Sequence, residues 1–357
     1  MATITETVPE WTPPTVSLGK VPLVTPARSR GQDIKGDFPL DQIVVDNFPP
    51  GTQVHSSDRY GASAWTVTAR IVTTLPNGDP KLYFLKCAEE GQGKAMLEGE
   101  FNSMVELYKT SPDFVPEPYA WGKLSVSQPA TYYFLCDFIE MGNMNPDPAQ
   151  LATKLVKLHK ASKSPTGMFG FHIDTCQGSL PQRTAWNPSW VDFYIQLVRG
   201  AMALNTEKNG NWKNLEQLVD RLITHVVPQV LGPLEADGRV VKPTLIHGDL
   251  WDGNIGTSLE NGELYIFDAS VYYAHNEMEI AMWRARFCKI LGAKVYLNSY
   301  LNRMGISEPV EQFEDRNRIY SFYMTLHESA CHNGSSFREE CYENLNYLVN
   351  KYAPVDE

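Results

Sequence analysis

The sequence lacks a long hydrophobic run. Its 357 residues contain no stretch of about 18 consecutive apolar residues, roughly the length that a membrane-spanning helix needs. The first ten residues, MATITETVPE, also lack the positive start and apolar core of a signal peptide. These absences predict a cytoplasmic protein with no membrane partner.

Positive charge and paired cysteines are scarce as well. Lysine and arginine number 31 against 42 aspartates and glutamates, which gives a net charge of −11, and no run of five basic residues occurs. An acidic protein repels phosphate backbones, so we expect no nucleic-acid partner. No Cys-x-x-Cys pair is present, which argues against a disulfide scaffold and predicts reduced, buried thiols. The six cysteines are Cys87, Cys136, Cys176, Cys288, Cys331 and Cys341.

What the sequence does contain is enough apolar material, 43% of its residues, for a sizeable core, and its length favours two lobes over one. Residues 1–35 are rich in Pro and Thr and are predicted to be an N-terminal extension. Residues 36–137 carry mostly strand patterns and are predicted to form an N-terminal lobe. Residues 138–357 carry mostly helical patterns and are predicted to form a C-terminal lobe.

Hydrophobic periodicity gives the elements of both lobes. Strand patterns begin at Ile43, and two β-rich segments around Asn77-Gly78 predict a hairpin. One helix is predicted over residues 93–109. Farther along, long helical patterns include residues 277–291 and 313–352, the latter as more than one helix. The predicted fold class is therefore α+β, with an N-terminal antiparallel sheet and one helix followed by a mostly helical lobe.

The most informative segment is LIHGDLWDGNIG, residues 245–256, in which an apolar strand leads into Asp249 and Asn254 follows five residues later. A second short apolar strand then ends in Asp268. Phosphoryl transfer needs a carboxylate to orient and deprotonate a hydroxyl, and an amide and a carboxylate to hold Mg²⁺. The spacing therefore predicts Asp249 as the catalytic base and Asn254 and Asp268 as metal ligands, with ATP as the second cofactor.

Such a site also needs a lysine on an upstream strand and a glutamate on the next helix. Lys86 stands in an apolar strand pattern, and Glu100 follows on the predicted helix. We favour Glu100 over Glu98 because residues two apart point about 200° away from each other on a helix. Lys86 and Glu100 are thus predicted to be catalytic, with Lys86 contacting phosphate.

Nucleotide contacts beyond Lys86 are predicted from position along the chain. The loop before the first hairpin strand offers Gly61 and Ser63 to the phosphates, although it is not rich in glycine. The link between the lobes, which includes Asp137 and Ile139, is predicted to bind adenine through its backbone.

These residues resemble the fructosamine and ketosamine 3-kinase family, which is related to aminoglycoside and choline kinases. The family motif His-Gly-Asp-Leu-Trp-x-Gly-Asn stands at residues 247–254, with Trp251 as its distinctive member. Further similar segments are residues 96–100, 169–178 and 268–277. Together they extend over about residues 84–285, in the family's order.

The resemblance implies a bilobal protein-kinase-like fold. It also implies ATP-dependent phosphorylation of the 3-hydroxyl of a ketosamine, such as fructosamine or ribulosamine, free or on glycated protein, with a role in deglycation. By the same resemblance Trp251 forms an aromatic wall for the sugar, and His275 and Glu277 belong to the substrate region, where they brace the chain after Asp268. Asp252, at a position where the family has another residue, is assigned to the substrate region as well.

The sequence departs from the family pattern at several positions. The family's Gly-Gly-Gly-Cys-type phosphate loop is missing, Asp252 replaces a serine, and Thr184 replaces an asparagine. We hypothesise that the Asp252 carboxylate favours an amine-bearing substrate. Two alternatives stay open: a kinase for another amine-bearing or hydroxylated metabolite, and a nucleotide-binding pseudokinase without turnover.

Overall fold

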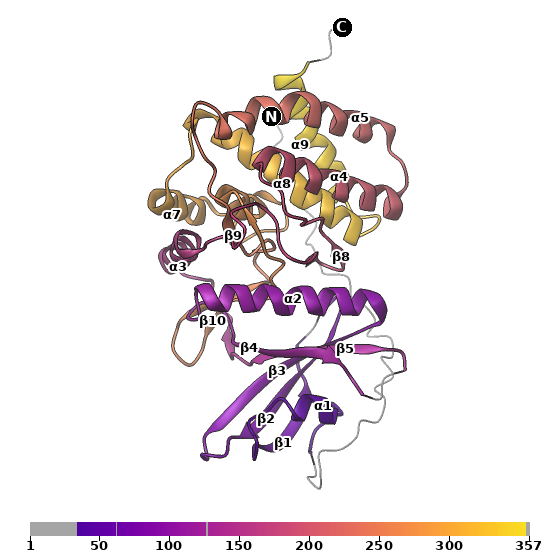
Figure 1. Cartoon of the computed structure of the whole chain (residues 1–357), viewed down its shortest axis with the longest axis vertical. Coiled ribbons are helices and arrows are strands. Elements are labelled where there is room, and N and C mark those ends of the chain that lie inside the picture. Colours follow the sequence, from indigo (N-terminus) through magenta and orange to yellow (C-terminus); the bar gives the residue numbers. More distant parts are fainter. Residues whose placement is uncertain (1–33, 62, 126–127, 355–357) are drawn as a thin grey trace, which may run out of the picture.

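The first half of the computed structural model is built on a five-stranded antiparallel sheet in the order β1-β2-β3-β5-β4 (Figure 1). The structure describes residues 34–61, 63–125 and 128–354. The predicted hairpin is confirmed as β2 and β3, which pair from Val67↔Cys87 to Thr74↔Pro80. The strands are β1 (Gln53–Arg59), β2 (Val67–Thr74), β3 (Pro80–Glu89), β4 (Pro118–Lys123) and β5 (Thr131–Asp137).

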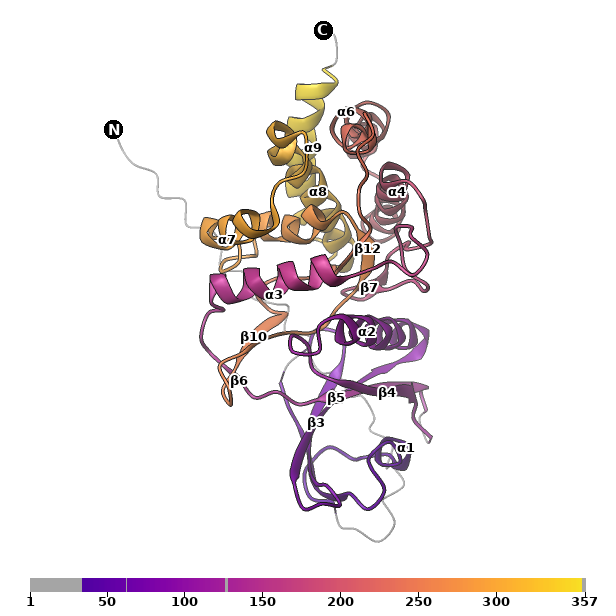
Figure 2. The ribbon, with the colours of Figure 1, turned by 60° about the vertical axis from the view of Figure 1, so that its left-hand side comes forward.

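Alternation along β3 gives the sheet two different faces, because successive side chains of a strand point to opposite sides. Tyr83, Leu85 and Cys87 join a buried cluster on the outer face, covered by residues 34–48. Helix α2 (Glu90–Thr110) covers the inner face and lies between the sheet and the C-terminal helices (Figures 1 and 2). Lys86 points to this inner face and therefore toward the other lobe.

The start of the described chain differs from the strand predicted at Ile43. A short helix, α1 (Gln42–Val45), forms there because the Asp41 side chain caps it by accepting the Ile43 N–H at 3.0 Å. Of the predicted extension, residues 1–33 lie outside the described residues. Lys35 forms a parallel bridge to Ser56 of β1, so the chain is part of the lobe from there on. The predicted lobe boundaries stay a prediction.

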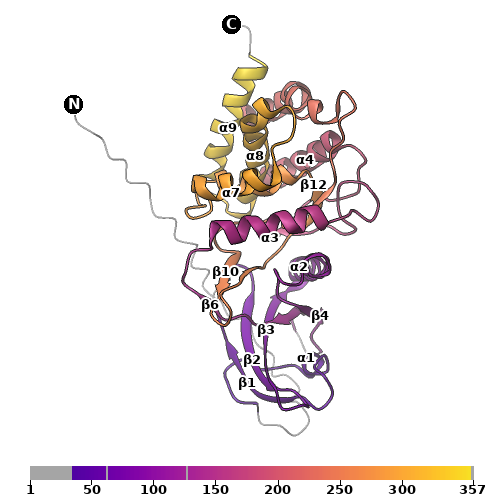
Figure 3. The ribbon, with the colours of Figure 1, turned by 90° about the vertical axis from the view of Figure 1, so that its left-hand side faces the viewer.

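After the sheet the chain is mostly helical, and Figure 3 shows these helices gathered on the side of α2 away from the sheet. The α-helices are α3 (Pro148–Ala161), α4 (Trp190–Asn209), α5 (Lys213–Arg221), α6 (Val227–Val230), α7 (Lys294–Met304), α8 (Phe313–Cys331) and α9 (Phe337–Tyr352). Shorter helical turns are η1 (Leu222–Val226), η2 (Gly232–Glu235), η3 (Asn276–Arg284) and η4 (Val310–Gln312). The main core joins them to α2 through residues such as Leu97 and Met104.

The second lobe also contains short strands between its helices. They are β6 (Met141–Gly142), β7 (Cys176–Gln177), β8 (Leu180–Pro181), β9 (Thr244–Ile246), β10 (Ile255–Ser258), β11 (Leu264–Ile266) and β12 (Tyr272–Ala274). β9 pairs with β12, and β10 pairs with both β11 and β6. No helix in the described part of the chain has the length and apolarity to cross a membrane.

The long helix predicted over residues 277–291 is wrong. The segment forms the 3-10 helix η3 and then an irregular turn. The backbone N–H groups of residues 289, 290 and 291 donate to the carboxylate of Asp252 at 2.6–2.8 Å. In an α-helix these groups would donate to carbonyls four residues earlier, so a side chain distant in sequence has replaced the helical bonds.

Candidate active site

Asp249 and Asn254 are brought together by the turn between β9 and β10. The Asn254 Nδ2 donates to the backbone oxygen of Asp249 at 2.8 Å and to its Oδ2 at 3.0 Å. Burial raises the pKa of Asp249 well above its usual range, and the negative charges of Glu328 and Asp268 raise it further. A raised pKa makes this carboxylate a stronger base toward a hydroxyl.

The turn that carries Asp249 is stabilised by hydrogen bonds to the Glu279 carboxylate. Glu279 accepts the N–H groups of His247 at 2.5 Å and Gly248 at 3.3 Å. Gly248 has a φ of +80°, and a Cβ there would lie 2.3 Å from the Ser270 oxygen, so only glycine fits. His247 accepts the Asp249 N–H on Nδ1 at 3.3 Å and donates from Nε2 to Phe267 O at 2.9 Å. Burial lowers the pKa of His247, in keeping with this neutral ring.

Lys86 connects the two lobes at the site. Its Nζ lies 2.7 Å from Glu100 Oε1 and is also hydrogen-bonded to Asp268 Oδ1. Burial alone would lower the pKa of Lys86, but the charges of Asp268 and Glu100 outweigh it and the pKa is raised. The lysine is therefore charged and fixed between the lobes, and the structure pairs it with Glu100 as predicted.

Asp268 and Asn254 have donor atoms that suit magnesium. The Asn254 amide nitrogen is engaged by Asp249, so its oxygen is available. Asp268 adopts a φ of +59°, a left-handed backbone that non-glycine residues keep mainly at functional sites. Mg²⁺ bound with a nucleotide needs only one or two protein carboxylates. This agrees with the described residues, among which no cage of three or more His, Cys, Asp or Glu side chains gathers.

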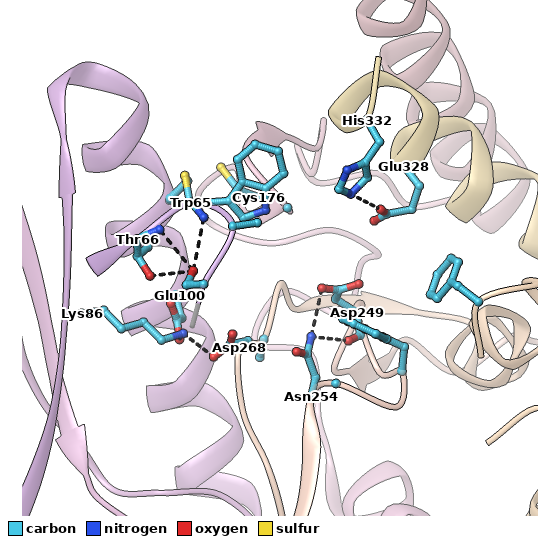
Figure 4. Close-up of a pocket in the computed structure, with 18 of the residues that line it drawn as sticks. Trp65, Thr66, Lys86, Glu100, Cys176, Asp249, Asn254, Asp268, Glu328 and His332 are labelled. Atoms are coloured by element: carbon cyan, nitrogen blue, oxygen red, sulfur yellow. Dashed lines mark hydrogen bonds and ion pairs between the residues drawn. The ribbon is translucent and has the colours of Figure 1, made fainter. Parts of the chain in front are cut away.

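These residues line one pocket of about 370 Å³ between the lobes (Figure 4). Lys86, Glu100, Asp268, Asn254 and Asp249 all face it. Trp251 forms one wall and meets Phe287 edge-on, with ring centroids 5.6 Å apart. Among the predicted phosphate-loop residues, Ser63 lines the pocket.

The other predicted nucleotide residues lie apart from this pocket. Gly61, Asp137 and Ile139 are not among the described residues that line it. Near the predicted adenine position Tyr60 packs edge-on against Phe138, with ring centroids 4.8 Å apart. The Arg70 guanidinium lies 5.9 Å and 5.8 Å from the centroids of the same two rings, so these side chains cover the link between the lobes.

The assignment of His275 and Glu277 to the substrate region needs correction. Both are buried in the second lobe and neither lines the pocket. The Glu277 carboxylate forms a fully buried ion pair with Arg316 at 2.8 Å. His275 contacts the hydroxyls of Tyr320 at 2.9 Å and Ser307 at 2.8 Å. They brace the C-terminal lobe because their polar atoms are already satisfied inside it.

Asp252 and Thr184 also lie outside the set of described residues that line the pocket. Both carboxylate oxygens of Asp252 accept the backbone N–H groups of residues 289–291, and the residue does not line the pocket. Thr184 is fully buried and donates to Ile173 O at 2.7 Å. The hypothesis that Asp252 attracts an amine therefore does not fit the geometry.

Several pocket residues were not found from the sequence. Glu328 and His332 come from the end of α8 and just beyond it, Phe337 starts α9, and Trp65 comes from the loop before β2. The available signal was the i,i+4 spacing of Glu328 and His332 on a predicted helix, which places both on one face.

All six cysteines are free in the described structure, and four of them are buried.

The fold and the site together define a protein of the bilobal protein-kinase-like fold, with its catalytic-type residues in the cleft between a sheet lobe and a helical lobe. The chain belongs to the fructosamine kinase family, whose model matches residues 63–351. The predicted resemblance and fold class are thereby confirmed.

Curated relatives carry names of the same kind. Protein-ribulosamine 3-kinase, chloroplastic, of Oryza sativa subsp. japonica is 35% identical over 66% of this chain and 63% of its own length. The Arabidopsis thaliana protein of that name is 32% identical over 68% and 70%. The mouse ketosamine-3-kinase is 28% identical over 56% and 68%. The chain thus spans somewhat less than two thirds of the rice relative.

Solved structures agree on the fold. A protein assigned as a fructosamine-3-kinase from Haemophilus somnus 129PT superposes with a TM-score of 0.68 at 19% identity, covering 86% of this chain and 96% of that one. The aminoglycoside phosphotransferase APH(4)-Ia, in a complex with AMP-PNP and hygromycin B, gives a TM-score of 0.56 at 16% identity over 87% and 97%.

Proposed function

We propose that the chain is an ATP- and magnesium-dependent kinase that phosphorylates the 3-hydroxyl of ketosamines, such as fructosamines and ribulosamines, free or on glycated protein. The observation that carries the proposal is the shared pocket: Lys86 lies on one side and Asp249 on the other, with Asp268 and Asn254 between them (Figure 4). Membership of the fructosamine kinase family and the names of the curated relatives support it.

In this proposal Asp249 orients the sugar hydroxyl and accepts its proton, and Asn254 holds the carboxylate in place. Lys86, fixed by Glu100, contacts the phosphates. Asn254 and Asp268 would hold magnesium, which would neutralise charge on the transferring group. Since little covalent chemistry falls to the protein, catalysis is mostly positioning and electrostatic stabilisation. Elimination of the 3-phosphate as inorganic phosphate, followed by hydrolysis of the sugar–nitrogen bond to release the amine, would give the reaction a deglycation role.

The nucleotide base belongs, by the same proposal, at the backbone of Asp137 and Ile139, with Gly61 and Ser63 over the phosphates. We also propose a cytoplasmic location, which the free cysteines support. The rice and Arabidopsis relatives are named as chloroplastic, and fractionation of the cells that make this protein tests the difference.

The experiment is phosphate transfer from ATP to a fructosamine and to a ribulosamine, with wild type and Asp249→Asn compared. We expect transfer by wild type and a loss in kcat of about 10²- to 10⁴-fold in the variant, the usual contribution of a general base. Asp220→Asn is the matched control, because Asp220 is exposed on α5. Magnesium-dependent ATP binding without transfer to either sugar would overturn the ketosamine assignment in favour of another metabolite or a pseudokinase.

A further inference from the structure

Helix α8 brings to the pocket a carboxylate that the family motifs do not contain, that of Glu328. Its side chain is 12% exposed. Its Oε1 accepts the Gln177 Nε2 at 3.0 Å, and its Oε2 lies 3.2 Å from the His332 Nε2. These contacts fix where the carboxylate points, and Figure 4 shows it on the same side of the pocket as Asp249, away from Lys86.

The two ends of the pocket differ in charge. At one end Lys86 is paired with Glu100 and Asp268. At the other end are Asp249 and Glu328, close enough that Glu328 contributes the largest electrostatic effect on the pKa of Asp249. Among the described residues that line the pocket, Lys86 is the lone lysine or arginine. At the Asp249 end the two carboxyl groups face one basic side chain of the lining, His332, whose Nε2 lies 3.2 Å from Glu328 Oε2, so acidic groups outnumber basic ones there.

Aromatic rings enclose this acidic end. The His332 ring lies 5.7 Å from the Trp65 ring of the N-terminal lobe and 5.9 Å from Phe337. Trp251 completes the wall beside Asp249. Aromatic faces attract cations and exclude water, which strengthens the interaction of a carboxylate with a positively charged group.

We propose that Glu328 determines substrate specificity by binding the ammonium group of the substrate while the sugar hydroxyl meets Asp249. The proposal rests on the proposed function and deepens it: the substrate class is a sugar that carries a protonated secondary amine. Glu328 takes the role that the sequence suggested for Asp252, because Glu328 lines the pocket and Asp252 does not.

The test compares two substrates that differ in one atom: 1-deoxy-1-(alkylamino)fructose, which is charged, and the corresponding 1-O-alkyl ether, which is neutral. We expect wild type to prefer the amine. We expect Glu328→Gln to raise KM for the amine by about 10- to 100-fold, the usual value of a hydrogen bond to a charged group. KM for the ether should change little, because the ether has no ammonium group to lose. Since the Glu328 charge also raises the pKa of Asp249, kcat should fall by a similar factor for both substrates, so the amine preference is assessed on the ratio of their kcat/KM values.

Glu314→Gln is the matched control, because Glu314 lies on the first turn of the same helix and is 59% exposed. It removes the same charge away from the pocket and should leave the preference for the amine unchanged. Glu328→Asp, which keeps the charge, should recover part of that preference. A loss of preference in Asp252→Asn instead of Glu328→Gln would overturn the assignment.

The wild-type comparison stands even if Glu328→Gln fails to fold. Equal kcat/KM for the amine and the ether in wild type would overturn this proposal and leave the proposed kinase in place. Transfer to neither substrate would overturn the proposed function, and this proposal with it.

Discussion

Two segments meet at the pocket, and they are held in different ways. The C-terminal segment from β9 to Asp268 is fixed by bonds on every side: Asn254 to Asp249, His247 to Phe267 and Glu279 to the turn. In the N-terminal loop at residues 63–66 the hydrogen bonds found among the described residues are local: Ser63 Oγ accepts from Trp65 N, Thr66 N and Thr66 Oγ1.

The difference shows how the work of the site is divided. The C-terminal segment carries the groups that are proposed to act on the substrate hydroxyl and the phosphates. Such groups need positions accurate to within about half an ångström, which a dense hydrogen-bond network can provide. The loop instead contacts the C-terminal lobe through the Trp65 ring, whose centroid lies 5.7 Å from that of His332. We therefore expect large effects from changes at the fixed segment and its partners, and small effects in the loop.

After that of Asp249→Asn, the largest effect is expected at Lys86, where the two lobes are joined. Lys86→Met removes the cation between Glu100 and Asp268, and we expect kcat to fall by about 10²- to 10³-fold, as for other preorganised electrostatic contacts. Steady-state ATP and ketosamine kinetics measure it. Lys109→Met, at an exposed lysine on α2, serves as control. Near-normal activity of the Lys86 variant would show that the ion-pair cluster is structural only.

The next effect is on stability and concerns the buried ion pair between Glu277 and Arg316. Glu277→Gln leaves the Arg316 charge buried without its partner, and breaking such a pair costs about 3–5 kcal/mol. We expect the free energy of unfolding in urea to fall by that amount, with kcat and KM unchanged per folded molecule. A higher KM for the sugar at unchanged stability would return Glu277 to the substrate site.

A smaller effect is expected from pH. Burial lowers the pKa of His275 from 6.5 to about 4, with the Arg316 charge lowering it and Glu277 opposing. Below about pH 6.5 the unfolded chain takes up the proton more readily, so stability is lost as pH falls from 6.5 toward 4. Between pH 7 and pH 5 the contribution of His275 to the free energy of unfolding falls by about 2 kcal/mol.

Urea unfolding of wild type and His275→Gln across that range measures the contribution of His275. We expect the variant to be less stable at pH 7, since two hydroxyl contacts change. Its free energy of unfolding should, however, depend less on pH than that of wild type. Parallel curves for the two proteins would mean that other groups carry the pH dependence.

The smallest effect is expected in the loop. Ser63→Ala removes the acceptor of its local bonds, which contributes about 1 kcal/mol. We expect KM for ATP to rise by about fivefold or less, with kcat little changed. A loss comparable to that of Lys86→Met would contradict the division between the two segments.

The sequence predicted the hairpin, the helical lobe and the grouping of Asp249, Asn254 and Asp268 because each depends on short-range patterns. Asp249 and Asn254 lie five residues apart in one turn, and Asp268 follows at the end of the neighbouring strand. Lys86 and Glu100 were paired from the order of a strand and the next helix, and the structure brings them to 2.7 Å. The catalytic and metal roles of these residues stay predictions.

Other features could not be read in this way. Residues 277–291 looked helical, but Asp252 takes the N–H groups that the helix would use. His275 and Glu277 follow Asp268, a predicted metal ligand, within ten residues in the sequence, yet their side chains turn toward Tyr320 and Arg316 of α8. In each case a partner distant along the chain decided the outcome.

By itself, then, the sequence determined the fold class, the family and the order of the residues expected to transfer phosphate, because these follow from local periodicity and from a motif within one continuous segment. Only the tertiary structure decided which charged groups face the pocket. In the folded protein Glu277 is buried in an ion pair, Asp252 accepts backbone N–H groups, and Glu328 lines the pocket. The position of each carboxylate depends on how its segment packs against others and on which hydrogen-bond donors this packing brings within reach.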